Sequence, residues 1–411
     1  MQTRLSAAFR ETPAGREADA ILRACVHCGF CTASCPTYRL LGDELDGPRG
    51  RIYLIKEMLE GSPAASATQL HLDRCLTCRA CETACPSGVR YGRLLDIGRQ
   101  QLERVVPRRA GERLLRSALL AALPHRKRFA ALLALARAVR PLLPASLRRS
   151  VPAPQRAGPW PAARHARRML VLTGCVQPAA APGIDVAAAR VLDRLGISLV
   201  RVDDGCCGAL AHHLSDEDRA REQMRRNVDA WWPEIERGVE AILATASGCG
   251  VMIHDYGTLL GDDPVYARKA ARISALFRDL GQVLAQELAQ TRAAPELPSP
   301  RTAGQRVALH VPCTLQHGLK IRGLIEPLLE RAGCRLTAVA DSHLCCGSAG
   351  SYSLLQPAIA RQLRVNKLAV LQADSPDVIV TANIGCLMHL AAGTERPVRH
   401  WIELLAEAWI D

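Results

Sequence analysis

Two short cysteine runs with identical spacing constrain this chain more than any other feature. The first is CVHCGFCTASCP, residues 25–36, and the second is CLTCRACETACP, residues 75–86. Each run has the form C-x2-C-x2-C-x3-C-P, which is a spacing for [4Fe–4S] clusters. Three thiolates on a tightly wound loop can reach three corners of one cubane. The fourth cysteine lies too far along the following helix to reach the last corner.

Each run is therefore expected to complete the cluster of the other, as in two-cluster domains of the bacterial ferredoxin pattern. The expected ligands of the first cluster are Cys25, Cys28, Cys31 and Cys85. Those of the second are Cys75, Cys78, Cys81 and Cys35. Zinc is the alternative, but a structural zinc site takes two cysteines from each of two C-x2-C elements. It does not require the third cysteine, the fourth cysteine or the proline.

The cysteine content supports metal binding rather than disulfides. The chain has 411 residues and 17 cysteines, an odd number, and its first twenty residues contain no apolar segment typical of a secretory signal. A cytoplasmic location is expected, and reducing compartments disfavour disulfides. The most apolar stretch, residues 117–139, is interrupted by Pro124 and a basic run, so no membrane-spanning helix is predicted.

An internal repeat dominates the second half of the chain. Apolar runs ending in Cys175 and Cys313 begin the two copies, and each copy continues through a CCG triplet to a later GC dipeptide. Cys175 and Cys313 are 138 positions apart, Cys206 and Cys345 139, and Cys249 and Cys386 137. Strands alternating with helices predict two small α/β units with mainly parallel sheets.

The expected fold class is α+β overall, with four parts. Residues 1–100 should form a helical domain with two clusters, in which Asp46 caps a helix that Pro48 begins and Gly61 ends. A basic helical connector follows at 101–168. The cysteine-rich repeats are predicted at 169–291 and 305–411, joined by a proline-rich linker at 292–304.

The repeats offer two further sets of cysteines. Gly208 and Gly347 allow an unusual turn after each adjacent pair, and the loops could converge at the strand ends. Cys334 is left over and is interpreted as a small buried hydrophobe. The two sets are Cys175, Cys206, Cys207 and Cys249, and Cys313, Cys345, Cys346 and Cys386.

These CCG repeats resemble the cysteine-rich domains of heterodisulfide reductase-type subunits. In that family the motif ends in C-x-x-C and holds a further iron–sulfur centre, whereas ASGCG and NIGCL each keep one cysteine. Four-ligand clusters, a zinc site, a redox thiol pair and a vestigial site therefore all remain open for these repeats.

The whole chain resembles the iron–sulfur subunits of bacterial glycolate oxidases. The resemblance rests on CVHCGFCTASCPTY, LGDELDGPRGRIYLIKEMLEG, PCTLQH, DSHLCCGSAGSYSLLQP, TANIGC and VRHWIELL. It implies an electron-transfer subunit without catalytic residues of its own, passing electrons toward a quinone or other acceptor. A partner with FAD would oxidise glycolate to glyoxylate. This chain has no G-x-G-x-x-G after a strand and no P-loop.

Other functions remain as alternatives. Relatives with this layout serve lactate or anaerobic glycerol-3-phosphate oxidation, and a zinc-stabilised scaffold protein is the alternative from another class. Several histidines lie near the cysteine loops, and ordinary polar or partly buried roles are expected for them. They are His212, His213, His310, His317 and His343.

The net charge of +13 is concentrated in one segment. Residues 104–168 contain 16 Arg and Lys against one acid, Glu112, so the segment carries +15 and the remainder about −2. Few aromatic residues accompany the arginines, which argues against nucleic acid. The amphipathic pattern favours docking either on the cytoplasmic face of the inner membrane or on a partner subunit, and the sequence does not choose between them.

Overall fold

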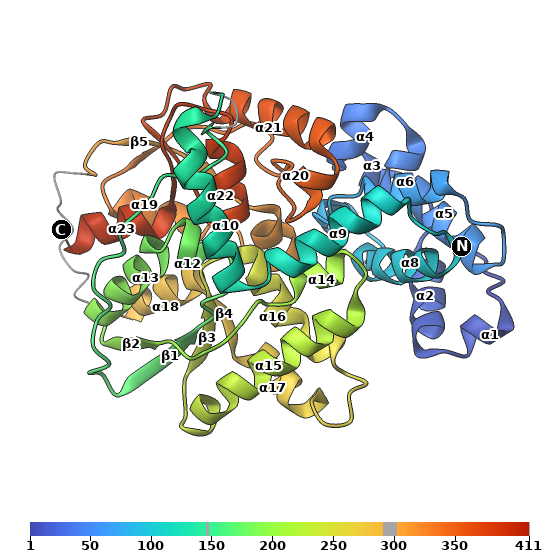
Figure 1. Cartoon of the computed structure of the whole chain (residues 1–411), viewed down its shortest axis with the longest axis horizontal. Coiled ribbons are helices and arrows are strands. Elements are labelled where there is room, and N and C mark those ends of the chain that lie inside the picture. The colour runs from blue at the N-terminus through green and yellow to red at the C-terminus, as the bar shows by residue number, and fades with distance from the viewer. Residues whose placement is uncertain (145–147, 291–301, 411) are drawn as a thin grey trace.

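The computed structural model describes residues 1–144, 148–290 and 302–410. For residue 410 it describes the backbone only. Figure 1 shows a helical N-terminal part at one end of the molecule and two α/β units at the other. Helix α9 runs from the N-terminal part toward the α/β units, and helix α10 lies across the face of those units. The linker predicted at 292–304 lies largely outside the described residues.

The C-terminal units are two four-stranded sheets with the same topology. The strand orders are β2-β1-β3-β4 and β6-β5-β7-β8, and every pairing is parallel. The expected α+β class and the mainly parallel sheets are confirmed. The strands are β1 (Arg167–Val171), β2 (Ile197–Val200), β3 (Ala241–Ala244), β4 (Phe277–Asp279), β5 (Arg306–His310), β6 (Arg335–Leu336), β7 (Val378–Thr381) and β8 (Val398–His400).

The central strands are the apolar runs of the repeat. Such short continuous runs form strands because both faces of a parallel sheet are covered by helices. The helices of the first unit are α12 (Gln177–Ala180), α13 (Gly183–Arg194), α14 (Ala209–His213), α15 (Glu217–Glu236), α16 (Ser247–Leu259), α17 (Ala267–Leu276) and α18 (Leu280–Gln290). Those of the second are η3 (Thr314–Gly318), α19 (Ile325–Arg331), α20 (Tyr352–Leu355), α21 (Pro357–Leu371), α22 (Ile384–Ala391) and α23 (Trp401–Ile410).

The two units share one hydrophobic core. Val171 of β1, Val307 of β5 and Trp401 of α23 belong to the same buried cluster. His400 Nε2 lies 2.9 Å from the carbonyl oxygen of Thr245, which also joins the units. The strand ends that carry the cysteines are therefore fixed relative to each other by packing as well as by backbone.

The N-terminal part is helical and has its own core, which includes Leu22, Ile55 and Leu94. Its elements are α1 (Ala7–Arg10), α2 (Pro13–Ala24), α3 (Phe30–Ala33), α4 (Pro36–Leu41), η1 (Glu44–Asp46), α5 (Pro48–Leu59), α6 (Ser66–Asp73), α7 (Ala80–Ala84) and α8 (Tyr91–Val105).

The predicted capping role of Asp46 is wrong. Helix α5 begins at Pro48, as expected, but its N-cap is Gly47 and no side chain caps it. The Asp46 carboxylate is instead completely buried and pairs with Arg51 and Arg74. A buried carboxylate needs such partners, and these arginines come from parts of the sequence that a capping motif does not include.

The basic connector lies against both parts of the molecule. Helices α9 (Ala110–Ala122) and α10 (Arg126–Val139) are followed by η2 (Arg140–Leu142), whereas residues 151–166 contain no helix. Arg108 pairs with Asp73 of α6, and Arg126 pairs with Asp204 beyond β2. Much of the basic charge is thus neutralised by acids outside the segment. No helix in the described ranges is long and apolar enough to cross a membrane.

Candidate iron–sulfur centres

The two N-terminal cysteine runs have the same backbone conformation. In the first, His27 and Gly29 have positive φ angles of 55° and 86°. In the second, Thr77 and Arg79, fifty positions later, have 53° and 59°. Left-handed residues at these points wind the loop tightly and direct successive backbone N–H groups to one side, an arrangement that suits anionic groups. Both loops are thus shaped as the spacing predicts.

The first run borders a cavity of about 430 Å³, counted with its open mouth. Cys85, from the end of the second run, lines this cavity, so the fold brings it to the first three cysteines. Cys28 is exposed, as are Val26 and Phe30 beside it. The cysteines of the lining are Cys25, Cys28, Cys31, Cys81 and Cys85.

The second run borders a smaller cavity of about 300 Å³. Cys35 lines it together with the three leading cysteines of the second run, Cys75, Cys78 and Cys81. Cys81 and Tyr91 belong to the linings of both cavities. The fourth cysteine of each run therefore lies beside the other run.

Because these thiols are buried, they favour binding of a positively charged metal group. It raises the pKa of Cys78 and of Cys81 well above the ordinary value, and neighbouring thiolates raise it further. Such cysteines are thiolates only when a metal compensates the charge. The residues present fit an iron–sulfur cluster. Its iron ions would compensate the charge of the thiolates, and the cluster would supply one-electron redox chemistry.

Polar groups around the second cavity point to its sulfur atoms. The Tyr91 hydroxyl donates to Cys75 Sγ at 3.6 Å, and the backbone N–H of Thr77 donates to the same sulfur at 3.4 Å. Arg51 lies 1% exposed on the lining and bonds to the His71 carbonyl at 2.7 Å. Donors and a buried cation stabilise negative charge here, which helps set a cluster potential.

The first repeat gathers its cysteines beyond the carboxyl ends of its strands. Cys175 follows β1, the Cys206–Cys207 pair follows β2, and Cys249 lies in the first turn of α16 after β3. Cys175 and Cys206 have their Sγ atoms 3.6 Å apart, and Cys207 contacts both Cys206 and Cys249. Gly208 has φ 92°, the turn that the CCG triplet predicts.

The second repeat repeats this arrangement and adds a histidine. Cys313 and Cys345 have their Sγ atoms 3.7 Å apart, and Cys346 contacts Cys345 and Cys386. His310, at the end of β5, lies with Cys346 and Cys386 so that one donor atom from each falls within 4.8 Å of the others.

The amide of Asn383 donates to Cys386 Sγ at 3.3 Å. Gly347 has φ 89°, and a Cβ there would lie 2.7 Å from the Ala360 carbonyl oxygen, so only glycine fits this turn. Its N–H donates to Cys345 Sγ at 3.4 Å. Hydrogen bonds to sulfur thus surround the second set as they surround the N-terminal cysteines.

The second N-terminal run lies directly against the second repeat. Leu76 shares a buried cluster with Cys313 and Cys345, and Cys78 packs against that cluster. The charge of Cys313 contributes to raising the pKa of Cys78. The Tyr352 hydroxyl of α20 donates to the Arg74 carbonyl at 3.0 Å, which holds the two segments together.

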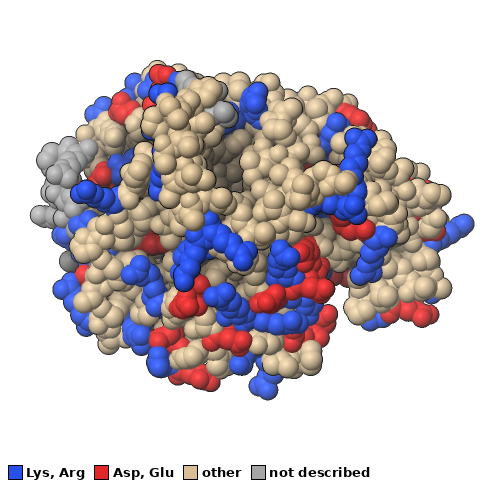
Figure 2. All heavy atoms as spheres, in the orientation of Figure 1, with Lys and Arg blue, Asp and Glu red and all other residues tan. Residues whose placement is uncertain are grey.

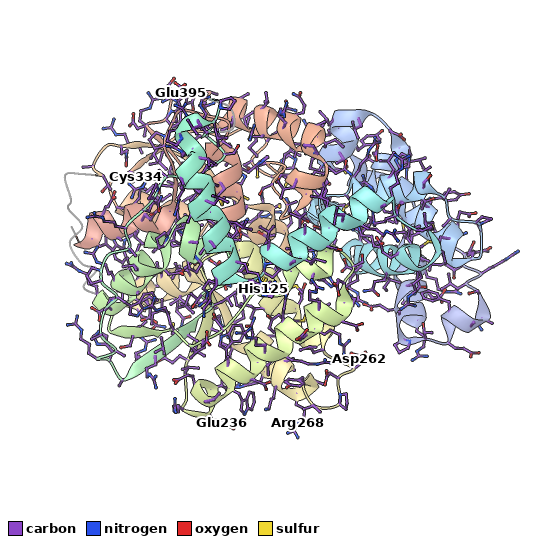
Figure 3. The ribbon with its side chains drawn as sticks, viewed as in Figure 1. His125, Glu236, Asp262, Arg268, Cys334 and Glu395 are labelled. Carbon is purple, nitrogen blue, oxygen red and sulfur yellow. The ribbon has the colours of Figure 1, made fainter. Side chains whose placement is uncertain are left out.

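The remaining histidines mostly have structural partners. His212 of α14 forms ion pairs with Asp96 and Glu217, and His317 lies 2.9 Å from Thr83 Oγ1 through Nδ1. Cys334 is 6% exposed in the core shared by the two units, and Figure 3 shows it near α19 and away from the N-terminal helices. The expectation of a buried hydrophobe holds for it.

The sequence could not separate His310 from these others. Its position three residues before Cys313 was a signal, but a histidine in an apolar strand is usually a core residue. The donors Tyr91, Arg51 and Asn383 were also missed. Each comes from an element distant in sequence from the sulfur or loop that it supports, so no local motif identifies it.

Comparison with known proteins supports this organisation. Residues 21–89 match the model of a 4Fe-4S dicluster domain. Residues 169–254 and 307–391 each match that of a cysteine-rich domain. Two [4Fe–4S] clusters are therefore the cofactors of the N-terminal domain, and the cysteine-rich domains fit further iron–sulfur centres.

Several curated proteins are similar to the chain. The glycolate oxidase iron–sulfur subunit of Escherichia coli (strain K12) is 52% identical over 410 residues, 99% of each chain. The probable glycolate oxidase iron–sulfur subunit of Bacillus subtilis (strain 168) is 30% identical, with 93% of each chain covered. Lactate utilization protein A of Shouchella clausii is 23% identical over 52% of this chain. The chain belongs to the family of glycolate oxidase iron–sulfur subunits.

Proposed function

We propose that this chain carries electrons within a glycolate oxidase complex, away from a partner subunit that holds FAD and oxidises glycolate to glyoxylate. The observation that carries this proposal is the pairing of two cysteine-lined cavities in one small domain, in a chain 52% identical to a glycolate oxidase iron–sulfur subunit. A two-electron flavin can be reoxidised in one-electron steps when clusters accept one electron each.

The proposed ligands follow the crossed pattern. Cys25, Cys28 and Cys31 with Cys85 hold one cluster, and their shared cavity supports this set. Cys75, Cys78 and Cys81 with Cys35 hold the other, supported by the second cavity. The four sulfurs of each repeat are proposed as ligands of further centres, since each set converges at the strand ends.

The arrangement also supports an order for the centres. Cys28 is exposed, so the cluster that it binds is the one that a partner subunit can approach. The second cluster lies behind it and contacts the second repeat through Leu76 and Cys78. We propose that electrons enter at the first cluster and pass through the second cluster to the centre in the second repeat.

The proposed electron acceptor is a quinone of the inner membrane. The protein is proposed to bind peripherally to the cytoplasmic face of that membrane. The support is a band of exposed leucines on the connector, with Leu114 73% and Leu135 63% exposed, beside the exposed bases Arg113 and Lys127. Apolar side chains flanked by cations suit an anionic lipid surface.

Metal analysis and turnover test the function. Anaerobically purified protein should contain iron and acid-labile sulfide, with about eight irons from two [4Fe–4S] clusters and more when the repeats are filled. Alone it should not oxidise glycolate with an artificial acceptor, and adding the flavoprotein partner should restore turnover and reduce the clusters. Zinc without sulfide would contradict the proposal, as would turnover by this chain alone.

A further inference from the structure

The second cysteine-rich repeat contains a pair of buried polar residues that the first lacks. His310 ends β5 three residues before Cys313, and Leu172 occupies the same position before Cys175. His310 pairs in register with Thr381 of β7, five residues before Cys386. The residue five before Cys249 is Ala244. Two adjacent strand ends thus carry histidine and threonine in one repeat but leucine and alanine in the other.

The His310 ring has one nitrogen with a partner and one without. Nδ1 lies 2.9 Å from Thr381 Oγ1. Nε2 is buried and has no hydrogen-bond partner among the described residues. A buried polar atom without a partner carries an uncompensated desolvation cost. The side chain is 2% exposed, so bulk water does not reach it.

The surroundings of the ring suit metal binding. A ring nitrogen of His310 and the Sγ atoms of Cys346 and Cys386 lie within 4.8 Å of one another. A neutral imidazole has one protonated nitrogen and one nitrogen whose lone pair can bind a metal. When Nδ1–H donates to Thr381, that nitrogen is Nε2, and such a hydrogen bond on the opposite nitrogen is usual for ligating histidines.

We propose that His310 Nε2 is a ligand of the iron–sulfur centre in the second repeat, together with Cys346 and Cys386. This inference rests on the proposed cysteine ligands of that repeat. The two repeats then hold different centres, one bound by cysteines alone and one bound by cysteines and an imidazole.

A neutral imidazole in the ligand set changes the redox properties. The identity and number of the ligands help set the reduction potential of an iron–sulfur centre, and the second repeat would have an imidazole that the first lacks. The second repeat should therefore differ from the first in the reduction potential of its centre. It is also the repeat whose Cys313 and Cys345 share a buried cluster with Leu76 of the second N-terminal run.

The test uses the full-length protein purified anaerobically. His310→Leu installs the residue of the first repeat, and His310→Gln keeps a polar side chain without an imidazole. His400→Leu is the matched control, because His400 is equally buried but bonds to the Thr245 carbonyl and lies on no cysteine loop. Each protein is analysed for iron and sulfide, by redox-titrated EPR, and by pulsed EPR after 15N-histidine labelling.

The expected result is a strong nitrogen hyperfine coupling in the wild type that both His310 variants abolish. The variants should also show a shifted potential, or lost iron, for one centre only. The signals of the two N-terminal [4Fe–4S] clusters report whether each variant is folded. His400→Leu should retain the coupling.

Different results would contradict the proposed cysteine ligands and the proposed histidine ligand. Wild-type protein with no iron beyond about eight per chain, or with zinc in the second repeat, would overturn the proposed cysteine ligands and the inference with them. Extra iron with no histidine coupling, and with unchanged potentials in both His310 variants, would overturn the histidine ligand alone. If neither variant folds, the labelling of the wild type still decides.

Discussion

At the scale of single residues, the groups that matter most are those that touch sulfur. Tyr91 is 4% exposed and donates to Cys75, whereas Cys35 reaches the second cavity from the first run. In both cases the residues that lie close together in space are far apart in the sequence. Two substitutions test them.

Tyr91→Phe should lower the reduction potential of the second cluster by roughly 20–60 mV, the equivalent of one hydrogen bond. The hydroxyl stabilises the more negative reduced state, and phenylalanine keeps the ring packing. EPR-monitored redox titration measures the shift. Tyr256→Phe is the control, since that hydroxyl bonds to the Cys207 carbonyl in the first repeat. An unchanged potential for Tyr91→Phe would exclude a role in tuning.

Cys35→Ser should damage the cluster held by residues 75–81 and leave the one held by residues 25–31 largely intact. The reason is that Cys35 lines the second cavity and not the first. EPR of the two reduced clusters, with iron analysis, measures the loss. Cys334→Ala should lose neither signal. Damage confined to the cluster of the first run would refute the crossed assignment.

At the scale of elements, the N-terminal helices are joined to the repeats by a few polar pairs that are buried or partly buried. Arg79 pairs with Asp255 of α16 at 2.8 Å, and His212 of α14 pairs with Asp96 of α8 at 3.2 Å. These contacts fix how closely the cysteine runs approach the repeats. The His212 contact also gives the junction a pH dependence.

The His212 junction should weaken as pH rises above neutrality. Burial opposes the charged ring, but Asp96 and Glu217 outweigh it and raise the pKa of His212 to about 10. Burial and the charge of His212 lower the pKa of the neighbouring His213 to about 3, so that ring stays neutral. Because the folded pKa of His212 exceeds its ordinary value of 6.5, its stabilisation is complete below pH 6.5 and is lost as pH approaches 10.

His212→Gln should therefore lower the melting temperature most at pH 6 and progressively less toward pH 10. Thermal unfolding of anaerobic protein across this range measures the difference from wild type. His254→Gln is the control, because His254 is exposed and pairs with Asp255 at the surface. A constant difference at all pH values would show that His212 is not charged in the folded protein.

At the scale of the whole molecule, the connector joins the parts and presents an apolar face. Figure 2 shows charged side chains gathered over α15 and α17, while the surface across α9 and α10 is largely uncharged with scattered basic groups. Several arginines of the basic segment form ion pairs with acids elsewhere in the chain, as with Arg108, Arg126 and Arg149, which pairs with Glu395. What remains exposed is leucine flanked by a few bases.

Co-sedimentation with vesicles tests this face. The wild type should bind vesicles containing phosphatidylglycerol at low salt and less at high salt, because each surface cation contributes about 1 kcal/mol. The double variant Leu114→Glu, Leu135→Glu should lose most of this binding. Val265→Glu, at a site 68% exposed outside the connector, should not. Equal binding by all three proteins would exclude the connector as a membrane contact.

Features that depend on short-range backbone geometry follow from local sequence patterns. The spacing of Cys25, Cys28 and Cys31 predicts the tightly wound loop, and the CCG triplets predict the left-handed turns at Gly208 and Gly347. The apolar runs predict the parallel strands. Each of these features is decided within about ten residues of chain, so a local pattern carries it.

The tertiary fold sets which of these local features come into contact. It turned the Asp46 carboxylate from the expected cap into a buried partner of two arginines. It also placed the second cysteine run against the second repeat and left the His310 nitrogen facing no protein partner in the described chain. These outcomes depend on packing between elements that are far apart in sequence, where burial and charge compensation determine each side chain's neighbours.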